Sequence, residues 1–237
     1  MSRYAGRRVL VVGMGGLGCP ASLALAQAGV REFTIADPDV VELSNLHRQP
    51  WYRSSDVGSP KVEVAAGRLR EAFRSTRVTA LPVRVDSERA ASLFVEHDVI
   101  IDGTDDVESK FLLSETAVRH RVPLVHGGVI RFEGQAMLIA PEGPCLRCLF
   151  EPPTRDEMTS CARAGVLGTV AGVIGATQAV LGLAALDGER NQYGRLIVFD
   201  GWKLSQRTIA VSRAPDCPIC GNTAGNESRR DALLGVQ

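Results

Sequence analysis

A glycine-rich turn between an apolar strand and a helix is the feature of this sequence that most constrains its fold. Val9–Val12 is typical of a buried strand, and the alanine-rich segment that starts at Leu17 is typical of a helix. The turn that joins them carries four glycines, Gly13, Gly15, Gly16 and Gly18. Such a turn brings backbone N–H groups at a helix N-terminus close to a phosphate. Asp37 follows a second apolar run, where its carboxylate can accept hydrogen bonds from a ribose. Taken alone, these residues favour a dinucleotide-binding domain.

Strands and helices are predicted to alternate along the first half of the chain. The pattern indicates strands over 8–12, 33–36, 78–83, 99–101 and 122–126, and helices over 17–28, 61–74, 87–96 and 107–120. It predicts an α/β fold, with a Rossmann-like, mostly parallel sheet and helices on both faces. Beyond residue 128 we expect a strand over 131–140, a loop over 151–160, an apolar helix, and antiparallel C-terminal strands near 195–200 and 206–212.

Charge and hydropathy exclude several classes of partner. The 237 residues carry 27 basic and 27 acidic side chains, so we expect neither nucleic acid nor an anionic membrane as the main partner. The N-terminus lacks the apolar core of a signal peptide, which predicts a cytoplasmic protein. Ala164–Leu186 is uncharged and long enough to span a bilayer, but it contains five glycines and Gln178. We therefore favour a buried or subunit-interface helix.

The loop after the second strand carries cations suited to a nucleotide triphosphate. It contains Ser44, Asn45, Leu46, His47, Arg48 and Gln49. Asn45 can donate to phosphate oxygens, and Arg48 can bind them through two N–H groups. Lys61, at a predicted helix start, is near enough in sequence to join them. A dehydrogenase needs little positive charge there. The alternative is solvated surface charge.

Acidic residues follow the strand that ends at Ile101. In doubly wound sheets, ligands bind at the carboxyl ends of the strands. Asp105 or Asp106 could hold Mg²⁺ against phosphates, because Mg²⁺ usually takes one or two carboxylates plus phosphate oxygens. The alternative for either residue is a helix N-cap, and one of them can cap while the other binds metal.

Paired cysteine spacing indicates metal chemistry. Cys145 and Cys148 form one CxxC pair, and Cys217 and Cys220 form another. Their spacing suits a tetrahedral, structural Cys₄ zinc site, with redox dithiols as the alternative. Since 68 residues separate the pairs, the fold must bring them together. Of the two other cysteines, Cys161 lies beside Arg163, which favours a reactive thiolate, whereas Cys19 fits a small packing residue.

The combination of motifs resembles the ThiF/MoeB/HesA family of adenylyltransferases, which are similar to ubiquitin-activating enzymes. The resemblance covers about residues 8–221 and is carried by GMGGLG, Asp37, SNLHRQ, SPK with Lys61, DGTDD and the two CxxC pairs. The ending, with CPICG, is most similar to the thiamine-pathway member. The segment from Cys161 to Val166 resembles the one that carries the family's sulfur-handling cysteine.

This resemblance implies a reaction and a set of partners. A homodimer of single-domain chains would bind ATP and Mg²⁺, with structural Zn²⁺. It would adenylate the C-terminal carboxylate of a ubiquitin-like sulfur carrier protein ending in Gly-Gly, and release pyrophosphate. A separate sulfur donor protein would then contribute to a carrier thiocarboxylate. Within the domain, 1–237, residues 8–127 would form the nucleotide-binding half and 128–221 the zinc-binding and carrier-binding half.

The resemblance also implies residue roles. Gly16 would pack against the nucleotide, Asp37 would hold the ribose, Asn45, Arg48 and Lys61 would grip the phosphates, and Asp105 would hold Mg²⁺. Catalytic roles are expected for Cys161, Arg48, Lys61 and Asp105, and nucleotide binding for Gly13, Gly15, Gly16, Gly18, Asp37, Ser44, Asn45, Arg48, Gln49, Lys61, Asp105 and Asp106. Cys161 would attack the adenylate or exchange sulfur.

The sequence departs from the family at two points. Members usually carry an arginine motif in an N-terminal extension, which Arg3, Arg7 and Arg8 do not match, and Asp106 stands where relatives often have Asn. A non-catalytic module that docks a ubiquitin-like protein is one alternative. A relative that adenylates a small molecule or a tRNA base is another.

Overall fold

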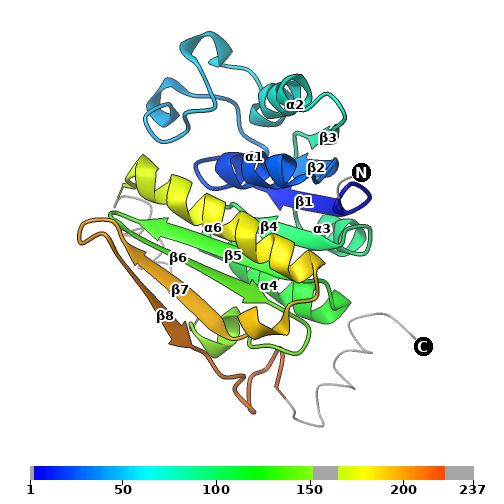
Figure 1. Ribbon diagram of the computed structural model, residues 1–237, viewed down its shortest axis with the longest axis vertical. Coiled ribbons are helices and arrows are strands. Elements are labelled where there is room, and N and C mark those ends of the chain that lie inside the picture. The colour runs from blue at the N-terminus through cyan, green and yellow to red at the C-terminus, as the bar shows by residue number, and fades with distance from the viewer. Residues whose placement is uncertain (1–2, 152–164, 222–237) are drawn as a thin grey trace.

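The computed structural model describes residues 3–151 and 165–221, which fold around a mixed β-sheet (Figure 1). Within these residues, eight strands lie in the order β3-β2-β1-β4-β5-β6-β7-β8. The strands are β1 (Arg8–Val12), β2 (Glu32–Ala36), β3 (Arg77–Leu81), β4 (Val99–Asp102), β5 (Leu124–Ile130), β6 (Glu133–Ile139), β7 (Arg195–Asp200) and β8 (Ser205–Ala210). The α-helices are α1 (Gly18–Ala28), α2 (Lys61–Ala72), α3 (Ser87–Phe94), α4 (Val107–His120) and α6 (Gly168–Leu186).

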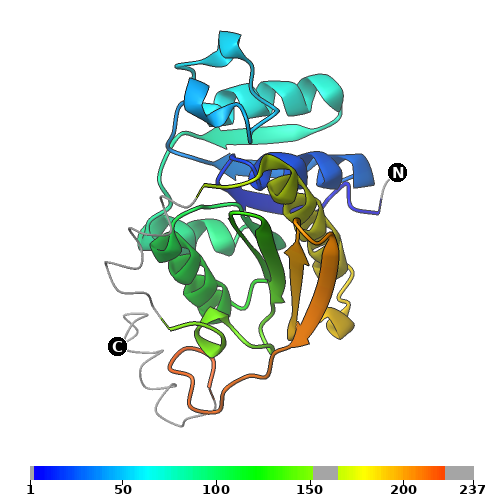
Figure 2. The same cartoon turned by 90° about the vertical axis from the view of Figure 1, so that its left-hand side faces the viewer.

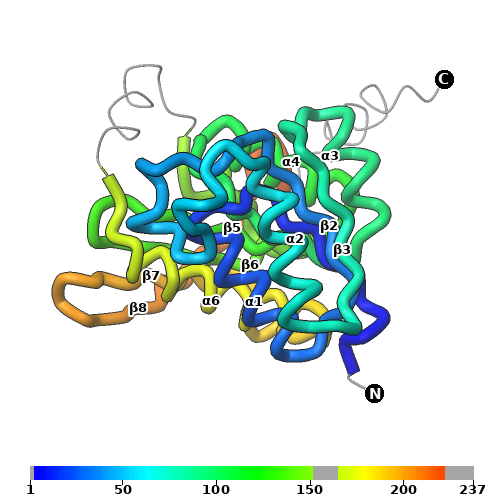
Figure 3. The backbone as a smooth tube through the Cα atoms, turned by 90° about the horizontal axis from the view of Figure 1, so that it is seen from above, coloured from blue at the N-terminus to red at the C-terminus, as the bar shows by residue number. Residues whose placement is uncertain are grey.

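The first five strands run parallel, and helices cover both faces of this part of the sheet. Side chains alternate along β1, so Val9 and Val11 join the core formed with α1, α2 and α6. Leu10 and Val12 join the core formed with α3 and α4. Seen from above, α3 and α4 lie on one side of the sheet, and α1 and α6 on the other (Figure 3). The predicted α/β architecture is confirmed.

The sheet changes from parallel to antiparallel at β6. β5 and β6 form a hairpin around Arg131, whose φ of 53° is left-handed. β6 pairs with β7 and β7 with β8, all antiparallel, so that β7 and β8 form the outer edge of the sheet (Figure 2). α4 and α6 contact β5 and β6, whereas β8 is exposed along its whole length. The predicted antiparallel ending is confirmed. The strand expected over 131–140 starts at Glu133, because residues 131 and 132 form the turn.

The apolar helix α6 is a core helix of this fold. Its length and hydropathy would allow it to cross a membrane, but half of that apolar stretch is buried against the rest of the protein. It packs on α1, β4, β5 and β6. A Cβ at Gly175 would lie 2.5 Å from Cγ of Pro20 and 2.6 Å from the carbonyl of Leu17, so glycine allows the close approach of α6 to α1. Val173 and Val180 remain exposed on its outer side.

Candidate functional site

The glycine turn lies at the carboxyl end of β1, beside the carboxyl ends of β2 and β4. Gly13 has a φ of +90°, and a Cβ there would lie 2.5 Å from the carbonyl oxygen of Gly103 in the loop after β4. The turn therefore needs glycine for both its backbone conformation and its packing. In doubly wound sheets, ligands bind at the carboxyl ends of strands where the strand order reverses, and here the order reverses between β1 and β4.

Asp37, at the end of β2, is tied to the glycine turn. Its Oδ2 accepts a hydrogen bond of 2.6 Å from the Met14 N–H, and its Oδ1 accepts one of 2.8 Å from the Asp39 N–H. Burial raises the pKa of Asp37, whereas the Lys61 charge and these two bonds oppose that rise. Each carboxylate oxygen retains a further lone pair, so the proposed contact with a ribose is compatible with these bonds.

The Ser44–Gln49 segment packs directly on the turn. The buried side chain of Asn45 organises it, because Asn45 Oδ1 accepts from Arg48 Nη2 at 3.3 Å and from Gln49 Nε2 at 3.1 Å. A Cβ at Gly16 would lie 3.0 Å from the Arg48 carbonyl oxygen, and one at Gly168, where α6 begins, would lie 2.8 Å from Arg48 Cα. The backbone of Arg48 is thus held between the turn and α6.

Lys61 is buried at the start of α2, and its charge faces the same region. Its Nζ lies 2.8 Å from Asp39 Oδ2, and Asp39 is exposed. The N–H of Asp39 donates in turn to Asp37 Oδ1, so Asp39 links Lys61 to that carboxylate, and the Lys61 charge opposes the rise in the pKa of Asp37. The structure therefore brings the glycine turn, Asp37, the Ser44–Gln49 segment and Lys61 together, as the sequence predicted; their roles toward a nucleotide stay predictions.

Two neighbouring carboxylates in the acidic loop after β4 have different surroundings. Asp106 is the N-cap of α4, and its Oδ1 accepts a hydrogen bond of 2.8 Å from the Ser109 N–H. Asp105 is exposed beside it. A carboxylate occupied as a cap is less available to a cation, so Asp105 is the better candidate for Mg²⁺. That assignment stays a prediction.

A buried ionic network lies under this loop, and the sequence reasoning missed it. Lys110 Nζ on α4 lies 3.2 and 3.1 Å from the carboxylate oxygens of Asp102 and donates to the carbonyl of Gly127 at 2.6 Å. The His126 Nδ1 lies 3.1 Å from Asp102 Oδ2. Thr104 donates through its hydroxyl to Asp102 Oδ1 at 2.6 Å. The sequence does hold a signal for this network. It is an aspartate that ends an apolar strand, followed by a lysine one or two helical turns into the next helix.

The network fixes the protonation of its members. Burial alone would raise the pKa of Asp102, but the Lys110 charge and the hydrogen bonds from His126 and Thr104 outweigh burial and lower this pKa to about 2. Burial lowers the pKa of His126, so its ring is neutral at pH 7 and donates to Asp102 through Nδ1. The segment that begins at Asp102 is therefore anchored by a charged carboxylate.

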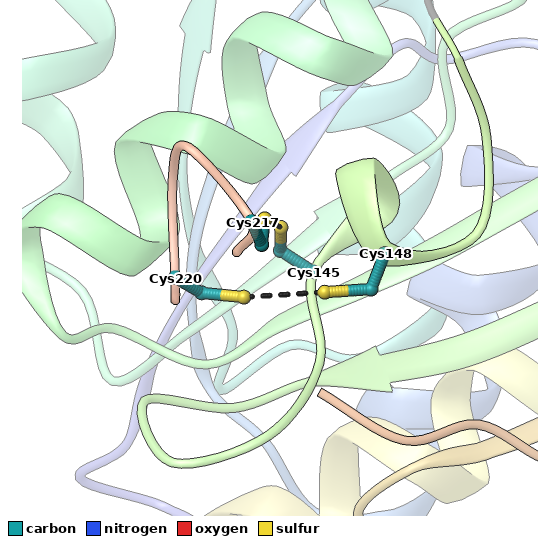
Figure 4. Close-up of side chains that lie close together, drawn as sticks. All are labelled: Cys145, Cys148, Cys217 and Cys220. Atoms are coloured by element: carbon teal, nitrogen blue, oxygen red, sulfur yellow. Dashed lines mark hydrogen bonds between the residues drawn. The ribbon is translucent and has the colours of Figure 1, made fainter. Parts of the chain in front are cut away.

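The four paired cysteines meet on the α4 side of the sheet (Figure 4). Their Sγ atoms all lie within 4.8 Å of one another, with Cys145 and Cys217 3.6 Å apart and Cys148 and Cys220 3.3 Å apart. Zn–S bonds of about 2.3 Å in a tetrahedron place sulfurs about 3.8 Å apart. A hydrogen bond with Cys145 lowers the pKa of Cys220, which favours the thiolate form that binds a metal. The cluster fits structural zinc.

Two cysteines remain besides the two CxxC pairs, Cys19 and Cys161. Cys19 is fully buried, and burial raises its pKa to about 12, so it is a thiol packed beneath the glycine turn. Cys161 lies outside the described residues, and its sulfur-handling role stays a prediction.

Comparison with known proteins decides the family. The model of the ThiF family matches residues 2–219. This chain belongs to the ThiF family. The SAMP-activating enzyme E1 of Haloferax volcanii is 40% identical over 222 residues, covering 92% of this chain and 82% of the relative. The sulfur carrier protein adenylyltransferase of Thermus thermophilus is 40% identical, covering 90% and 82%. The sulfur carrier protein ThiS adenylyltransferase of Escherichia coli is 37% identical, covering 91% and 86%.

Solved structures share the same fold. The E. coli protein MccB, in a crystal structure with ATP, superposes with a TM-score of 0.80 at 22% identity, covering 92% of this chain and 67% of that one. The family match spans both the parallel and the antiparallel parts of the sheet and extends into the second cysteine pair. The resemblance read from the motifs is therefore confirmed, including the expectation that the relatives are sulfur carrier adenylyltransferases.

Proposed function

We propose that this ThiF-family chain uses ATP to adenylate the C-terminal carboxylate of a small ubiquitin-like sulfur carrier protein. The observation that carries the proposal is the packing of the Ser44–Gln49 segment against the glycine turn, with Lys61 joined to Asp37 through Asp39. This arrangement places backbone amides and two cations around one end of the sheet, which suits a triphosphate better than a dinucleotide. The names of the relatives support the carrier as substrate.

In the proposed reaction, an oxygen of the carrier carboxylate attacks the α-phosphorus of ATP. The bond from the α-phosphorus to the bridging oxygen breaks, and pyrophosphate leaves with that electron pair. Asp37 would orient the ribose, and Asn45, Arg48 and Lys61 would align the phosphates and neutralise their developing charge. Lys61 would exchange its contact with the exposed Asp39 for a phosphate oxygen. Mg²⁺ held by Asp105 would supply further neutralisation of the phosphates when bound.

Later steps of the proposal concern sulfur and assembly. We assign to Cys161 the displacement of AMP from the carrier adenylate or the exchange of sulfur, with a separate protein as the sulfur donor.

We also propose a homodimer in the cytoplasm. Structural zinc would be held by Cys145, Cys148, Cys217 and Cys220, and the two halves of the domain would divide near residue 128. The uncharged, partly exposed helix α6, with Val173 and Val180 on its outer side, supports a subunit contact.

ATP–pyrophosphate exchange tests the proposal. We expect the purified chain to exchange labelled pyrophosphate into ATP only when a carrier ending in Gly-Gly is present. The Asp105→Asn variant should lose about 100-fold in exchange rate, roughly 2.7 kcal/mol, while keeping its stability because Asp105 is exposed. Asp106→Asn is the matched control, since Asn caps a helix as well as Asp does and should leave exchange within about threefold.

Two outcomes would contradict the proposal. The first is absence of exchange by the wild-type chain with every Gly-Gly carrier offered, although calorimetry shows that ATP binds. The second is equal exchange by Asp105→Asn and wild type, which would remove Asp105 from the site.

A further inference from the structure

The peptide groups on both sides of Met14 are held from opposite directions inside the glycine turn. Its N–H donates to Asp37 Oδ2 at 2.6 Å, and its carbonyl accepts from the hydroxyl of Tyr52 at 2.6 Å. The Cys19 thiol lies 3.3 Å from the same carbonyl. Met14, Cys19 and Tyr52 are all buried, so bulk water does not substitute for a lost partner here. The orientation of this part of the turn is therefore set by side chains.

Fixing the Met14 carbonyl also fixes the next amide. Across a trans peptide bond, the N–H of one residue points opposite to the carbonyl of the residue before it, and the described peptides contain no cis bond. Because the Met14 carbonyl points at the buried phenol, the N–H of Gly15 points away from it. Gly15 and Gly16 are the part of the turn against which Gln49 and Arg48 pack. Tyr52 thus determines the direction of the first amide on the ligand side of the turn.

Tyr52 also connects the other two parts of the proposed site. Its N–H donates to the carbonyl of Gln49 at 3.0 Å, at the end of the Ser44–Gln49 segment. Its hydroxyl lies 3.4 Å from the carbonyl of Lys61, at the start of α2. Burial raises the pKa of Tyr52, so the phenol keeps its proton and remains a donor at neutral and moderately alkaline pH. One side chain therefore joins the glycine turn to the two segments that carry the cations.

We infer that Tyr52 is a positioning residue for the triphosphate: its hydroxyl aims the glycine-turn amides and sets their spacing from Arg48 and Lys61. The inference rests on the proposed function, because it assumes that the triphosphate binds at the glycine turn. It assigns Tyr52 no contact with the reacting atoms. Its effect is on the affinity for nucleotide, and the carrier protein should be bound as before.

The Tyr52→Phe variant removes only the hydroxyl. We expect the dissociation constant of a non-hydrolysable ATP analogue, measured by calorimetry well below the melting temperature, to rise about tenfold. The KM for ATP should rise similarly, and the KM for the carrier should stay within twofold. Tyr4→Phe is the matched control, since it removes a phenol hydrogen bond to Asp187 at the distant C-terminal end of α6 and should leave all three constants unchanged.

A rescue experiment separates hydrogen bonding from packing. Cys19→Ser places a stronger donor beside the Met14 carbonyl, 3.3 Å from the present sulfur. In the Tyr52→Phe background it should recover at least threefold of the lost affinity. Wild-type affinity in Tyr52→Phe, or no recovery in the double variant, would overturn the inference and leave the proposed function standing. Failure of the wild-type chain to bind the analogue would overturn both.

Discussion

Replacing Lys110 by Met tests whether the buried network beneath the acidic loop is held by charge. The substitution keeps the length of the side chain but removes the ammonium group that contacts Asp102 and the carbonyl of Gly127. Asp102 is fully buried, and without Lys110 its carboxylate would keep only the hydrogen bonds from His126 and from Thr104. Removing one partner of a buried ion pair is strongly destabilising, by about 3–5 kcal/mol.

Proton uptake by the variant sets an upper limit on this cost. Asp102 can lose its uncompensated charge by taking up a proton, and for a carboxyl with the wild-type pKa of about 2 this costs about 7 kcal/mol at pH 7, at about 1.36 kcal/mol per pH unit. His126, 3.1 Å away, offers a cheaper route, because protonating it would create a new cation beside Asp102. We therefore expect Lys110→Met to lose about 3 kcal/mol of unfolding free energy at pH 7.

The pH dependence of the stability loss shows whether an uncompensated charge causes it. By either route the folded variant binds one proton more than the folded wild type, so the stability difference should narrow as pH falls, by about 1.36 kcal/mol per unit. Between pH 7 and pH 5.5 that amounts to about 2 kcal/mol. In the wild type, the depressed pKa of Asp102 contributes stability that is present above pH 3.8 and is lost as pH falls toward about 2.

Urea unfolding at the two pH values measures both effects. Lys110→Arg, which keeps the charge, is the control and should cost much less than Lys110→Met. The double variant Lys110→Met with Asp102→Asn should recover part of the loss, because it removes the charge that was left unpaired. A loss below about 1 kcal/mol, or a difference that is the same at pH 7 and pH 5.5, would refute the reasoning.

Three further predictions concern metal, backbone and sulfur. The purified protein should contain one zinc per chain by mass spectrometry, and Cys148→Ser should abolish it and lower the melting temperature by several degrees, since a structural zinc site contributes folding free energy; full zinc content in the variant would contradict the cluster. Gly13→Ala should destabilise by about 2 kcal/mol in urea unfolding, because φ is +90° and the new Cβ meets Gly103; a neutral effect would mean that the turn relaxes. Cys161→Ser should keep pyrophosphate exchange but lower the yield of carrier thiocarboxylate measured by mass, and an unchanged yield would make Cys161 a passive residue.

The fold was predictable because its signals are local. Apolar runs and a glycine turn place β1, α1 and β2 within a few residues of their observed bounds, and the Asp106 cap starts α4 where the sequence indicated. The sequence left open which of Asp105 and Asp106 caps α4 and which is the candidate for Mg²⁺, since two adjacent carboxylates cannot be told apart by their local sequence. The cap geometry distinguishes them, because only Asp106 accepts the hydrogen bond from the Ser109 N–H at 2.8 Å among the contacts of the described residues.

Contacts that join distant parts of the chain were not predictable. Tyr52 reaches Met14 across 38 positions, and nothing in its neighbourhood distinguishes it from a loop residue. His126 reaches Asp102 only because β5 pairs with β4, and Lys110 joins them because α4 packs back over those strands. These side chains acquire their roles from the sheet order, which the sequence suggests only in outline.

The pairing of β6 with β7 and the meeting of the two cysteine pairs close the same long loop of chain. Bringing together ends about 60 to 70 residues apart costs roughly 4 kcal/mol in chain entropy. This entropic cost arises only once for the two contacts. When β6 pairs with β7, the two cysteine pairs are already brought near each other, and the reverse also holds. A metal ion at the four cysteines would therefore stabilise the pairing of β7 and β8 with the rest of the sheet. Unfolding of this outer edge would be coupled to loss of the metal from the α4 side. Zinc loss should then be felt first as increased hydrogen exchange along β7.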